Sequence, residues 1–162
     1  MINSKISIAK LIGTKVILDL NSTDKENAIK ELLEHLIKID KLKHKKIELL
    51  DKLYEEIIER EKLSSTGIGF EIAIPHIRTQ YVEKPHLIVG VCKSGIEYDS
   101  IDGRPVKMIF LLVAPKNHCQ QNIEILSTMA RILKNEETRQ NLLDSDSPKA
   151  FVNVIKKAEE GI

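Results

Sequence analysis

The sequence contains no tryptophan, and aromatic residues occupy only 4% of its 162 positions. Surfaces that stack nucleic-acid bases or sugar rings rely on aromatic side chains, so this scarcity argues against both. The charges nearly cancel, with 25 Lys and Arg against 24 Asp and Glu, which gives a formal net charge of +1. This balance lacks the broad positive field of a general nucleic-acid binder, and we expect no nucleic-acid partner.

Cysteines and long apolar stretches are also scarce. The two cysteines, Cys92 and Cys119, cannot build a disulfide framework, which is typical of a reducing compartment. The longest apolar run is Met108–Ala114, far shorter than the ~20 residues that span a bilayer. Lysines at positions 5, 10 and 15 interrupt the N-terminus too often for the apolar core of a signal peptide. We therefore expect a soluble, cytoplasmic protein.

The hydrophobic pattern alternates between a helical period of 3.6 residues and the continuous apolar runs of buried strands. Helices are predicted at 4–11, after the capping-box motif Thr23–Glu26, at 46–62, at 122–134 and from Ser147-Pro148 onwards. Strands are predicted at 15–20, 70–75, 86–92 and 106–114. Because helices precede, follow and flank the strands, we predict an α/β fold with a mixed β-sheet of about five strands, flanked by helices on both faces. No repeat or linker divides the chain, so we expect a single domain over residues 1–162.

The segment Arg60–Thr79 has the composition of an anion-binding site. A predicted helix ends near Arg60, and a loop of small and polar residues follows it. Glycines in such a loop let backbone amides point at an anion, Ser65 and Thr66 add hydroxyl donors, and an arginine can clamp a phosphate. A buried strand then leads into His76, whose neutral imidazole is a nucleophile near neutral pH. These parts suit a histidine that takes up and gives away a phosphoryl group.

The residues alone leave a structural role open for each of these parts. A lone histidine at a strand end is often a structural or surface residue, and the helix dipole by itself favours an arginine near a helix C-terminus. The glycine loop lacks the Lys-Ser/Thr pair of a P-loop, so no nucleotide cofactor is predicted. Neighbouring His118 and Cys119 have no CxxC or HxxxH partners, so no metal site is predicted. The basic segment Lys41–Lys46 is either an anion-binding patch or a solvated connector, and its place between two helices favours the connector.

The motifs Ser65–Gly69 (STGIG) and Ala73–His76 (AIPH) resemble the active-site signature of a known family. They are similar to the enzyme IIA domains of the fructose/mannitol and nitrogen-regulatory class in the bacterial phosphoenolpyruvate-dependent sugar phosphotransferase system. The similarity extends over nearly the whole chain. It implies a phosphotransferase component that needs no cofactor, with His76 as the phosphorylated nucleophile and Arg60 as its supporting arginine. The expected phosphate-binding residues are Ser65, Thr66, Gly67, Arg78 and Asn122.

The resemblance also implies the partners. A phosphocarrier protein, HPr or its nitrogen-related counterpart, would supply the phosphoryl group, and a cysteine of a IIB component would receive it. The protein would then lie peripheral to a membrane IIC component at most. One alternative is a free-standing regulatory protein of the nitrogen-related branch, which acts by phosphorylation-dependent binding to target proteins. A second alternative is a binding module that has lost phosphoryl transfer.

Two positions depart from the family's pattern. The family usually has glycine directly after the active histidine, whereas this chain has Ile77 followed by Arg78. We expect a β-branched side chain there to narrow access to the imidazole, and Arg78 to add a phosphate contact. The family also tends to place a second histidine where this chain has Asn122, whose amide can donate a hydrogen bond but cannot relay a proton.

Overall fold

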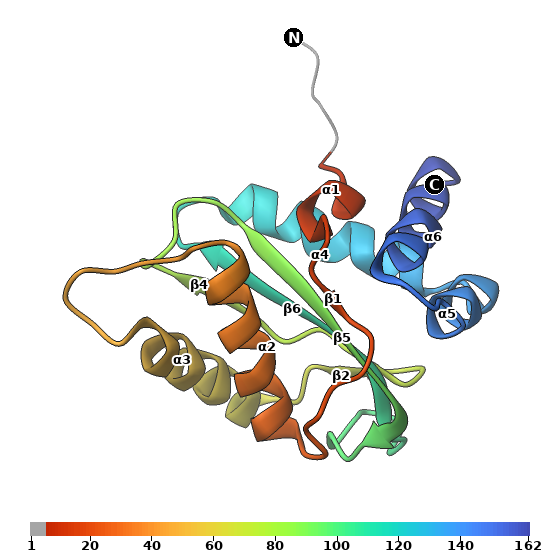
Figure 1. Ribbon diagram of the computed structural model, residues 1–162, viewed down its shortest axis with the longest axis horizontal. Helices are drawn as coiled ribbons and strands as arrows, with labels where there is room; N and C mark the ends of the chain where they lie inside the picture. Colours follow the sequence, from red (N-terminus) through yellow and green to blue (C-terminus); the bar gives the residue numbers. More distant parts are fainter. Residues whose placement is uncertain (1–5) are drawn as a thin grey trace, which may run out of the picture.

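The computed structural model describes residues 6–162, in which helices cover both faces of a mixed β-sheet (Figure 1). The helices are α1 (Ile8–Ile12), α2 (Lys25–Ile39), α3 (Leu49–Leu63), α4 (Cys119–Leu133), α5 (Glu136–Leu143) and α6 (Pro148–Glu160). The strands are β1 (Val16–Ile17), β2 (Gly67–Gly69), β3 (Ile72–Ala73), β4 (His76–Thr79), β5 (His86–Ile96) and β6 (Val106–Pro115). The predicted fold class is confirmed. Within residues 6–162 we find no helix that is both long enough and apolar enough to cross a membrane.

The sheet is built around the long antiparallel pair of β5 and β6, in the strand order β1-β5-β6-β3-β2. Strand β4 lies outside this path and pairs in parallel with β6. The parallel pairs β1–β5 and β3–β6 and the antiparallel pair β2–β3 complete the sheet. The sheet is therefore mixed, as expected.

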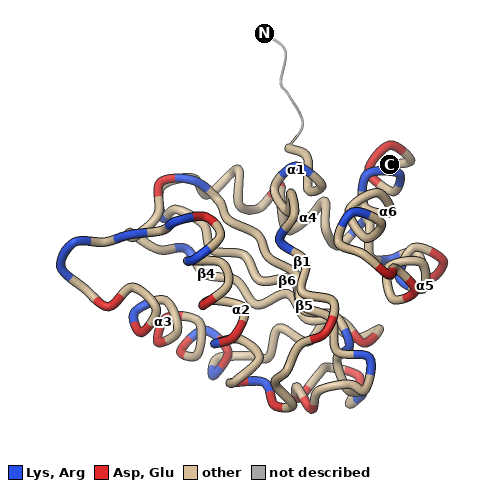
Figure 2. Tube along the Cα trace, viewed as in Figure 1, with Lys and Arg blue, Asp and Glu red and all other residues tan. Residues whose placement is uncertain are grey.

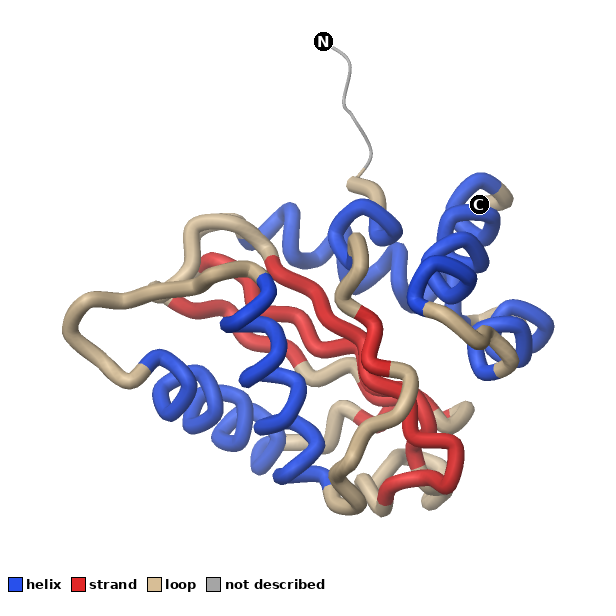
Figure 3. Tube along the Cα trace, in the orientation of Figure 1, coloured by secondary structure: helices blue, strands red, loops and turns tan. Residues whose placement is uncertain are grey.

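Each face of the sheet has its own hydrophobic core, because successive side chains of a strand point to opposite faces. In β6, Phe110 and Leu112 pack with α1, α4, α5 and α6, whereas Ile109 and Leu111 pack with α2 and α3. Figure 3 shows the strands as a layer between these two groups of helices. Continuous apolar runs in the sequence correspond to strands that are covered on both faces.

The start of α2 differs from the prediction. The side chain of Asp24, not Thr23, caps the helix by accepting a hydrogen bond from the backbone N–H of Asn27. The capping-box assignment to Thr23–Glu26 is therefore wrong by one residue, since an aspartate at the next position takes the cap. The first helix runs over Ile8–Ile12, and the part of its predicted range at positions 4 and 5 lies outside the described residues.

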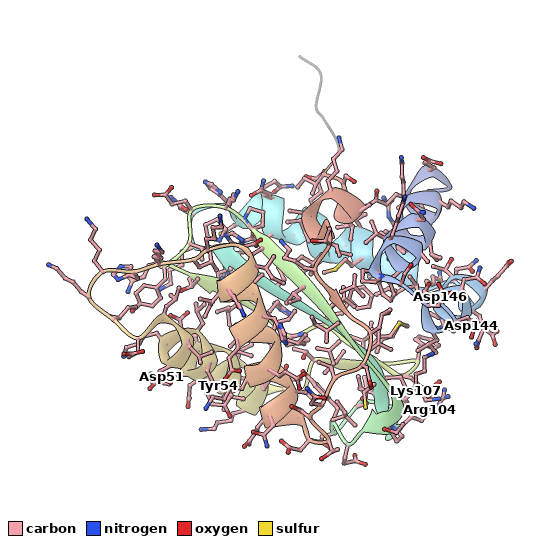
Figure 4. All side chains as sticks on the ribbon, in the orientation of Figure 1. Asp51, Tyr54, Arg104, Lys107, Asp144 and Asp146 are labelled. Carbon is pink, nitrogen blue, oxygen red and sulfur yellow. The ribbon has the colours of Figure 1, made fainter. Side chains whose placement is uncertain are left out.

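The predicted strand at 70–75 is divided. Phe70 and Glu71 have positive φ angles of 58° and 66° and form the two-residue turn between β2 and β3, as in a type I′ hairpin. The Glu71 carboxylate is 3.0 Å from Arg104 Nη2 and 2.9 Å from Lys107 Nζ. Arg104 precedes β6 and Lys107 lies in it, and both side chains are labelled in Figure 4. Pro75 cannot donate to a ladder, and the chain resumes as a separate strand at His76. His76 therefore opens a strand instead of following the end of one.

Candidate functional site

One hydrogen bond fixes the imidazole of His76, which lies half-buried at the first position of β4. Its Nδ1 is 2.7 Å from the backbone carbonyl oxygen of Ile74. A carbonyl oxygen can only accept, so Nδ1 carries the hydrogen and Nε2 keeps its lone pair. The ring therefore presents Nε2 as its nucleophilic atom.

A cleft of about 690 Å³ opens beside His76, between α3 and β4. Its positive charges come from Arg60 at the end of α3, Arg78 on β4 and Lys116 after β6. Its negative charges come from three carboxylates of α3. The lining residues are Glu55, Glu56, Glu59, Arg60, His76, Ile77, Arg78 and Lys116. The cleft therefore brings cationic side chains to a nucleophilic imidazole, which suits a phosphoryl group.

A second and more apolar pocket of about 260 Å³ lies on the α4 side of β4. His76, Ile77 and Arg78 line both hollows, so the start of β4 separates them. The remaining lining residues are Leu112, Ala114, Cys119, Asn122, Ile123 and Leu126. Apolar side chains therefore border one side of the imidazole.

The two predicted arginines are both in the cleft, and each is held by one hydrogen bond. Arg60 Nη1 donates to the carbonyl oxygen of Ser64 at 2.9 Å. Arg78 Nη1 donates to Cys119 Sγ at 2.9 Å. A guanidinium has five N–H donors, so both side chains keep donors for an anion.

The predicted loop donors lie elsewhere. Thr66 is buried, and its hydroxyl donates to the Glu61 carboxylate. The Ser65 hydroxyl donates to the carbonyl oxygen of Tyr98 at 3.1 Å and accepts from the Gly67 N–H. None of these loop residues lines the cleft or the apolar pocket. Ser65, Thr66 and Gly67 therefore do not face the cleft beside His76, although the Thr66 carbonyl oxygen accepts a hydrogen bond from the Ile74 N–H.

Gly67 lies so close to Ser100 that a side chain at position 67 would not fit. A Cβ added there would lie 2.4 Å from Ser100 Oγ and 2.9 Å from Ser100 Cα. The loop and the segment after β5 are thus packed backbone against backbone. This contact explains the glycine without an anion.

The two positions that depart from the family's pattern both border the apolar pocket. Ile77 alternates with His76 and Arg78 along β4, and its side chain packs into the core under α2 and α3. It is 7% exposed, so most of its bulk lies in the core, although it still lines both hollows beside His76. Asn122 is buried in the first turns of α4, where its Nδ2 donates to the carbonyl oxygen of Pro115 at 3.1 Å.

Sequence reasoning missed the acidic side of the cleft. The sequence pattern assigns Glu55, Glu56, Glu59 and Glu61 to an exposed helix face. The structure places the first three opposite β4, whereas Glu61 is buried, so its assignment to that face is wrong. The position of these three glutamates on the same helix as Arg60 was the one signal in the sequence that they lie near the site. Only the packing of α3 against β4 shows that they border His76. The lysines of the basic segment Lys41–Lys46 are exposed in the α2–α3 connection (Figure 2), and none lines either hollow. Across residues 6–162, no group of three or more His, Cys, Asp or Glu side chains is arranged to hold a metal ion.

Comparisons with known proteins show which family the chain resembles and which structures share its fold. A sequence model of the family described as "Phosphoenolpyruvate-dependent sugar phosphotransferase system, EIIA 2" matches residues 11–158. The fructose-specific EIIABC component of Bacillus subtilis is 36% identical over 143 residues, which cover 88% of this chain and 22% of that protein. This chain therefore spans only about a fifth of that relative.

Two solved structures share the fold. The crystal structure of nitrogen regulatory protein IIA-Ntr from Neisseria meningitidis has a TM-score of 0.82 and 26% identity, over 91% of this chain and 98% of that chain. The Escherichia coli complex of enzyme IIAMtl with phosphorylated enzyme IIBMtl has a TM-score of 0.72 and 19% identity, over 90% of this chain and 96% of that chain.

Proposed function

The chain belongs to the EIIA 2 family of the phosphoenolpyruvate-dependent sugar phosphotransferase system, and we propose that it carries a phosphoryl group on Nε2 of His76. The observation that supports this atom is the 2.7 Å contact between Nδ1 and the Ile74 carbonyl oxygen. It leaves Nε2 as the free nucleophile beside a cleft whose lining includes Arg60, Arg78 and Lys116. The proposal treats residues 1–162 as one enzyme IIA unit.

The transfer needs no proton relay through Asn122. Nε2 of His76 attacks the phosphorus atom of a phosphohistidine on the donor protein. The bond between phosphorus and the donor's ring nitrogen breaks, and its electron pair returns to the donor's imidazole. Phosphorylation at Nε2 makes the His76 ring cationic. The hydrogen bond from Nδ1–H to the Ile74 carbonyl oxygen stabilises that charge. Arg60 and Arg78 offset the charge of the phosphoryl oxygens in the transition state.

The phosphoryl donor that we propose is an HPr-like phosphocarrier protein, and the acceptor is a cysteine of a IIB component. The Escherichia coli complex, in which a IIA is paired with a phosphorylated IIB, supports a IIB component as the acceptor. The fructose-specific name of the Bacillus subtilis relative supports a fructose/mannitol-type system. Such a chain would meet the membrane only through the IIC component.

The test is phosphorylation with purified components. The protein is incubated with phosphoenolpyruvate, enzyme I and HPr, and its intact mass is measured before and after acid treatment. We expect one acid-labile phosphoryl group on the wild type and none on His76→Ala. His118→Ala is the matched control, because His118 is an exposed histidine at the start of α4, and it should be phosphorylated normally. An adduct that persists in His76→Ala would contradict the proposal.

A second candidate function is regulation within the nitrogen-related branch. The similarity to IIA-Ntr over 91% of this chain favours it. In that case, phosphorylation of His76 would control binding to target proteins, and no sugar would be transported. Deletion of the gene discriminates the two: loss of uptake of one sugar supports transport, whereas altered nitrogen or potassium responses with normal sugar uptake support regulation.

A further inference from the structure

A buried carboxylate, Glu61, lies directly after Arg60 in the last turn of α3. Its side chain is 4% exposed, and carboxylates are rarely buried unless they are paired. Four donors surround its two oxygens, and all four come from outside α3. They are Lys25 Nζ at 2.7 Å, the Thr66 N–H at 3.1 Å, the Thr66 hydroxyl and the Tyr98 hydroxyl at 3.2 Å.

A carboxylate suits this arrangement, and the hydroxyls of Thr66 and Tyr98 also lie 3.0 Å from each other. Two donors approach Oε1 and two approach Oε2, which matches the acceptor capacity of a carboxylate. Burial and the nearby Glu61 carboxylate raise the pKa of Tyr98 far above the ordinary value of a phenol, so its hydroxyl keeps the hydrogen that it donates. Lys25 Nζ also lies 4.4 Å from the centre of the Tyr98 ring.

The cluster joins segments that are far apart in the sequence. Lys25 opens α2, Glu61 lies in the last turn of α3, Thr66 precedes β2, and Tyr98 follows β5. Ser65 adds a further bond from the same loop to the Tyr98 carbonyl oxygen. The loop between α3 and β2 is therefore held at Ser65 and Thr66.

Arg60 depends on this loop. Its Nη1 donates to the carbonyl oxygen of Ser64, which lies between Glu61 and the anchored Thr66. The direction of the guanidinium thus follows from the position of the loop backbone. A residue that holds this backbone controls where the guanidinium lies in the cleft beside His76.

We propose that Glu61 is a positioning residue that, with Thr66, Tyr98 and Lys25, fixes the Ser64–Thr66 loop and thereby aims Arg60 at the phosphoryl group on His76. This inference rests on the proposed phosphoryl transfer. It gives Thr66, which the sequence had suggested as a direct phosphate donor, an indirect role. Glu61 touches neither the reacting atoms nor the cleft, since it does not line it.

The experiment is a double-mutant cycle between Glu61→Gln and Arg60→Ala. Glutamine keeps the shape but turns an N–H₂ group toward the surrounding donors. The rate of phosphoryl transfer from phosphorylated HPr is measured over a range of HPr concentrations, together with thermal stability. For Glu61→Gln we expect kcat to fall roughly 10- to 100-fold, as for other small misplacements of a transition-state contact, with KM unchanged.

The decisive readout is the double variant. If Glu61 acts through Arg60, Glu61→Gln causes no further loss of kcat in the Arg60→Ala background, although it still lowers the melting temperature there. The matched control is Glu31→Gln. Glu31 likewise holds a loop against a helix, but it accepts two backbone amides and one hydroxyl, from Asn21 and Ser22, at α2. This control should lower stability and leave kcat at the wild-type value.

Two results would overturn the inference. One is an unchanged kcat in Glu61→Gln while Arg60→Ala is slow, and the other is an equal fold-loss of kcat in both backgrounds. Either result leaves the proposed function standing. Failure of the wild type to accept a phosphoryl group on His76, or a wild-type rate in Arg60→Ala, would instead remove the proposed site and the inference with it.

Discussion

At the scale of single residues, the orientation of His76 decides which ring nitrogen can react. Nδ1 is occupied by the Ile74 carbonyl oxygen at 2.7 Å, and Nε2 is left as the free nitrogen beside the cleft. A ring phosphorylated at Nε2 would keep its Nδ1–H donor, so the proposed transfer leaves this hydrogen bond in place. The geometry therefore favours Nε2 as the atom that carries the phosphoryl group.

We predict that the phosphorylated protein carries the group on Nε2 and none on Nδ1. The measurement is ¹⁵N NMR of protein with labelled histidine, in which phosphorus–nitrogen coupling and the pattern of ring resonances distinguish the two isomers. Unphosphorylated protein gives the reference spectrum of the Nδ1–H tautomer. Coupling to Nδ1 would contradict the assignment of the hydrogen bond.

Ile77 illustrates how neighbouring residues on one strand take different roles. We predict that Ile77→Ala lowers the free energy of unfolding by about 2–5 kcal/mol, the usual cost of truncating a buried isoleucine. Transfer to His76 should persist below the melting temperature, since the Ile77 side chain packs under α2 and α3. Urea unfolding and the mass assay check the two parts. The control is Ile101→Ala, because Ile101 is 84% exposed and should change stability little.

At the scale of elements, the N-termini of α2 and α3 differ in their capping, and the C-terminus of α3 contributes to the site. The N-terminus of α2 has a side-chain cap from Asp24, whereas Glu48 before α3 makes no side-chain cap bond. The C-terminus of α3 is where Arg60 and Glu61 lie side by side, one directed to the cleft and one to the interior. The last turn of α3 therefore joins the core to the site.

We predict that Asp24→Ala lowers the melting temperature by roughly 2–4 °C, because it removes the cap of the long helix α2. Thr23→Ala should leave the melting temperature unchanged, since the Asp24 carboxylate and not the Thr23 hydroxyl accepts the Asn27 N–H. Circular dichroism during heating measures both. Equal falls in melting temperature for the two variants would contradict this prediction and support a capping box that begins at Thr23.

At the scale of the whole molecule, a second polar cluster joins the C-terminal end of α2 to the sheet. Asp40, which follows α2, lies 2.9 Å from Lys15 Nζ and 2.6 Å from His86 Nδ1. Burial lowers the pKa of His86 despite the attraction of Asp40. Burial of Asp40 is outweighed by hydrogen bonds from Lys15 and His86, so its pKa is also lowered.

These shifts predict a loss of stability in acid in two steps. Since the pKa of folded His86 lies below its ordinary value of 6.5, the unfolded state binds the proton first, and stability falls as the pH drops below about 6.5. Asp40 adds a second fall as the pH drops below its ordinary value of 3.8. Lys15 and Lys84 also face His86 and disfavour its protonated form.

The first step is measured by urea unfolding between pH 7.5 and 5.5. The control is His86→Gln, which cannot titrate and should flatten the dependence of unfolding free energy on pH in this window. A wild-type stability that rises as the pH falls from 7.5 to 5.5 would contradict the direction of the His86 shift. His118 is exposed, and its replacement serves as a further variant without expected effect.

The sequence by itself determined the elements with strong local signals and the identity of the motif. Apolar runs predicted β5 and β6, periodic apolar residues predicted α2, α3, α4 and α6, and the motif around Ala73–His76 pointed to the histidine. These features depend on residues close together in the chain. The short helix α5, the strand β4 and the hairpin of β2 and β3 were missed. The hairpin was missed because Phe70 and Glu71 are unusual residues for a turn with positive φ.

Only the tertiary structure decided which side chains meet His76. The register of β4 on β6 directs His76 and Arg78 away from the core and Ile77 into it, and a register is set by long-range pairing. The packing of α3 brings its glutamates to the cleft, and the buried Glu61 draws the Thr66 hydroxyl away from it. Local sequence specifies which groups are present, whereas contacts between distant segments specify where each donor is directed.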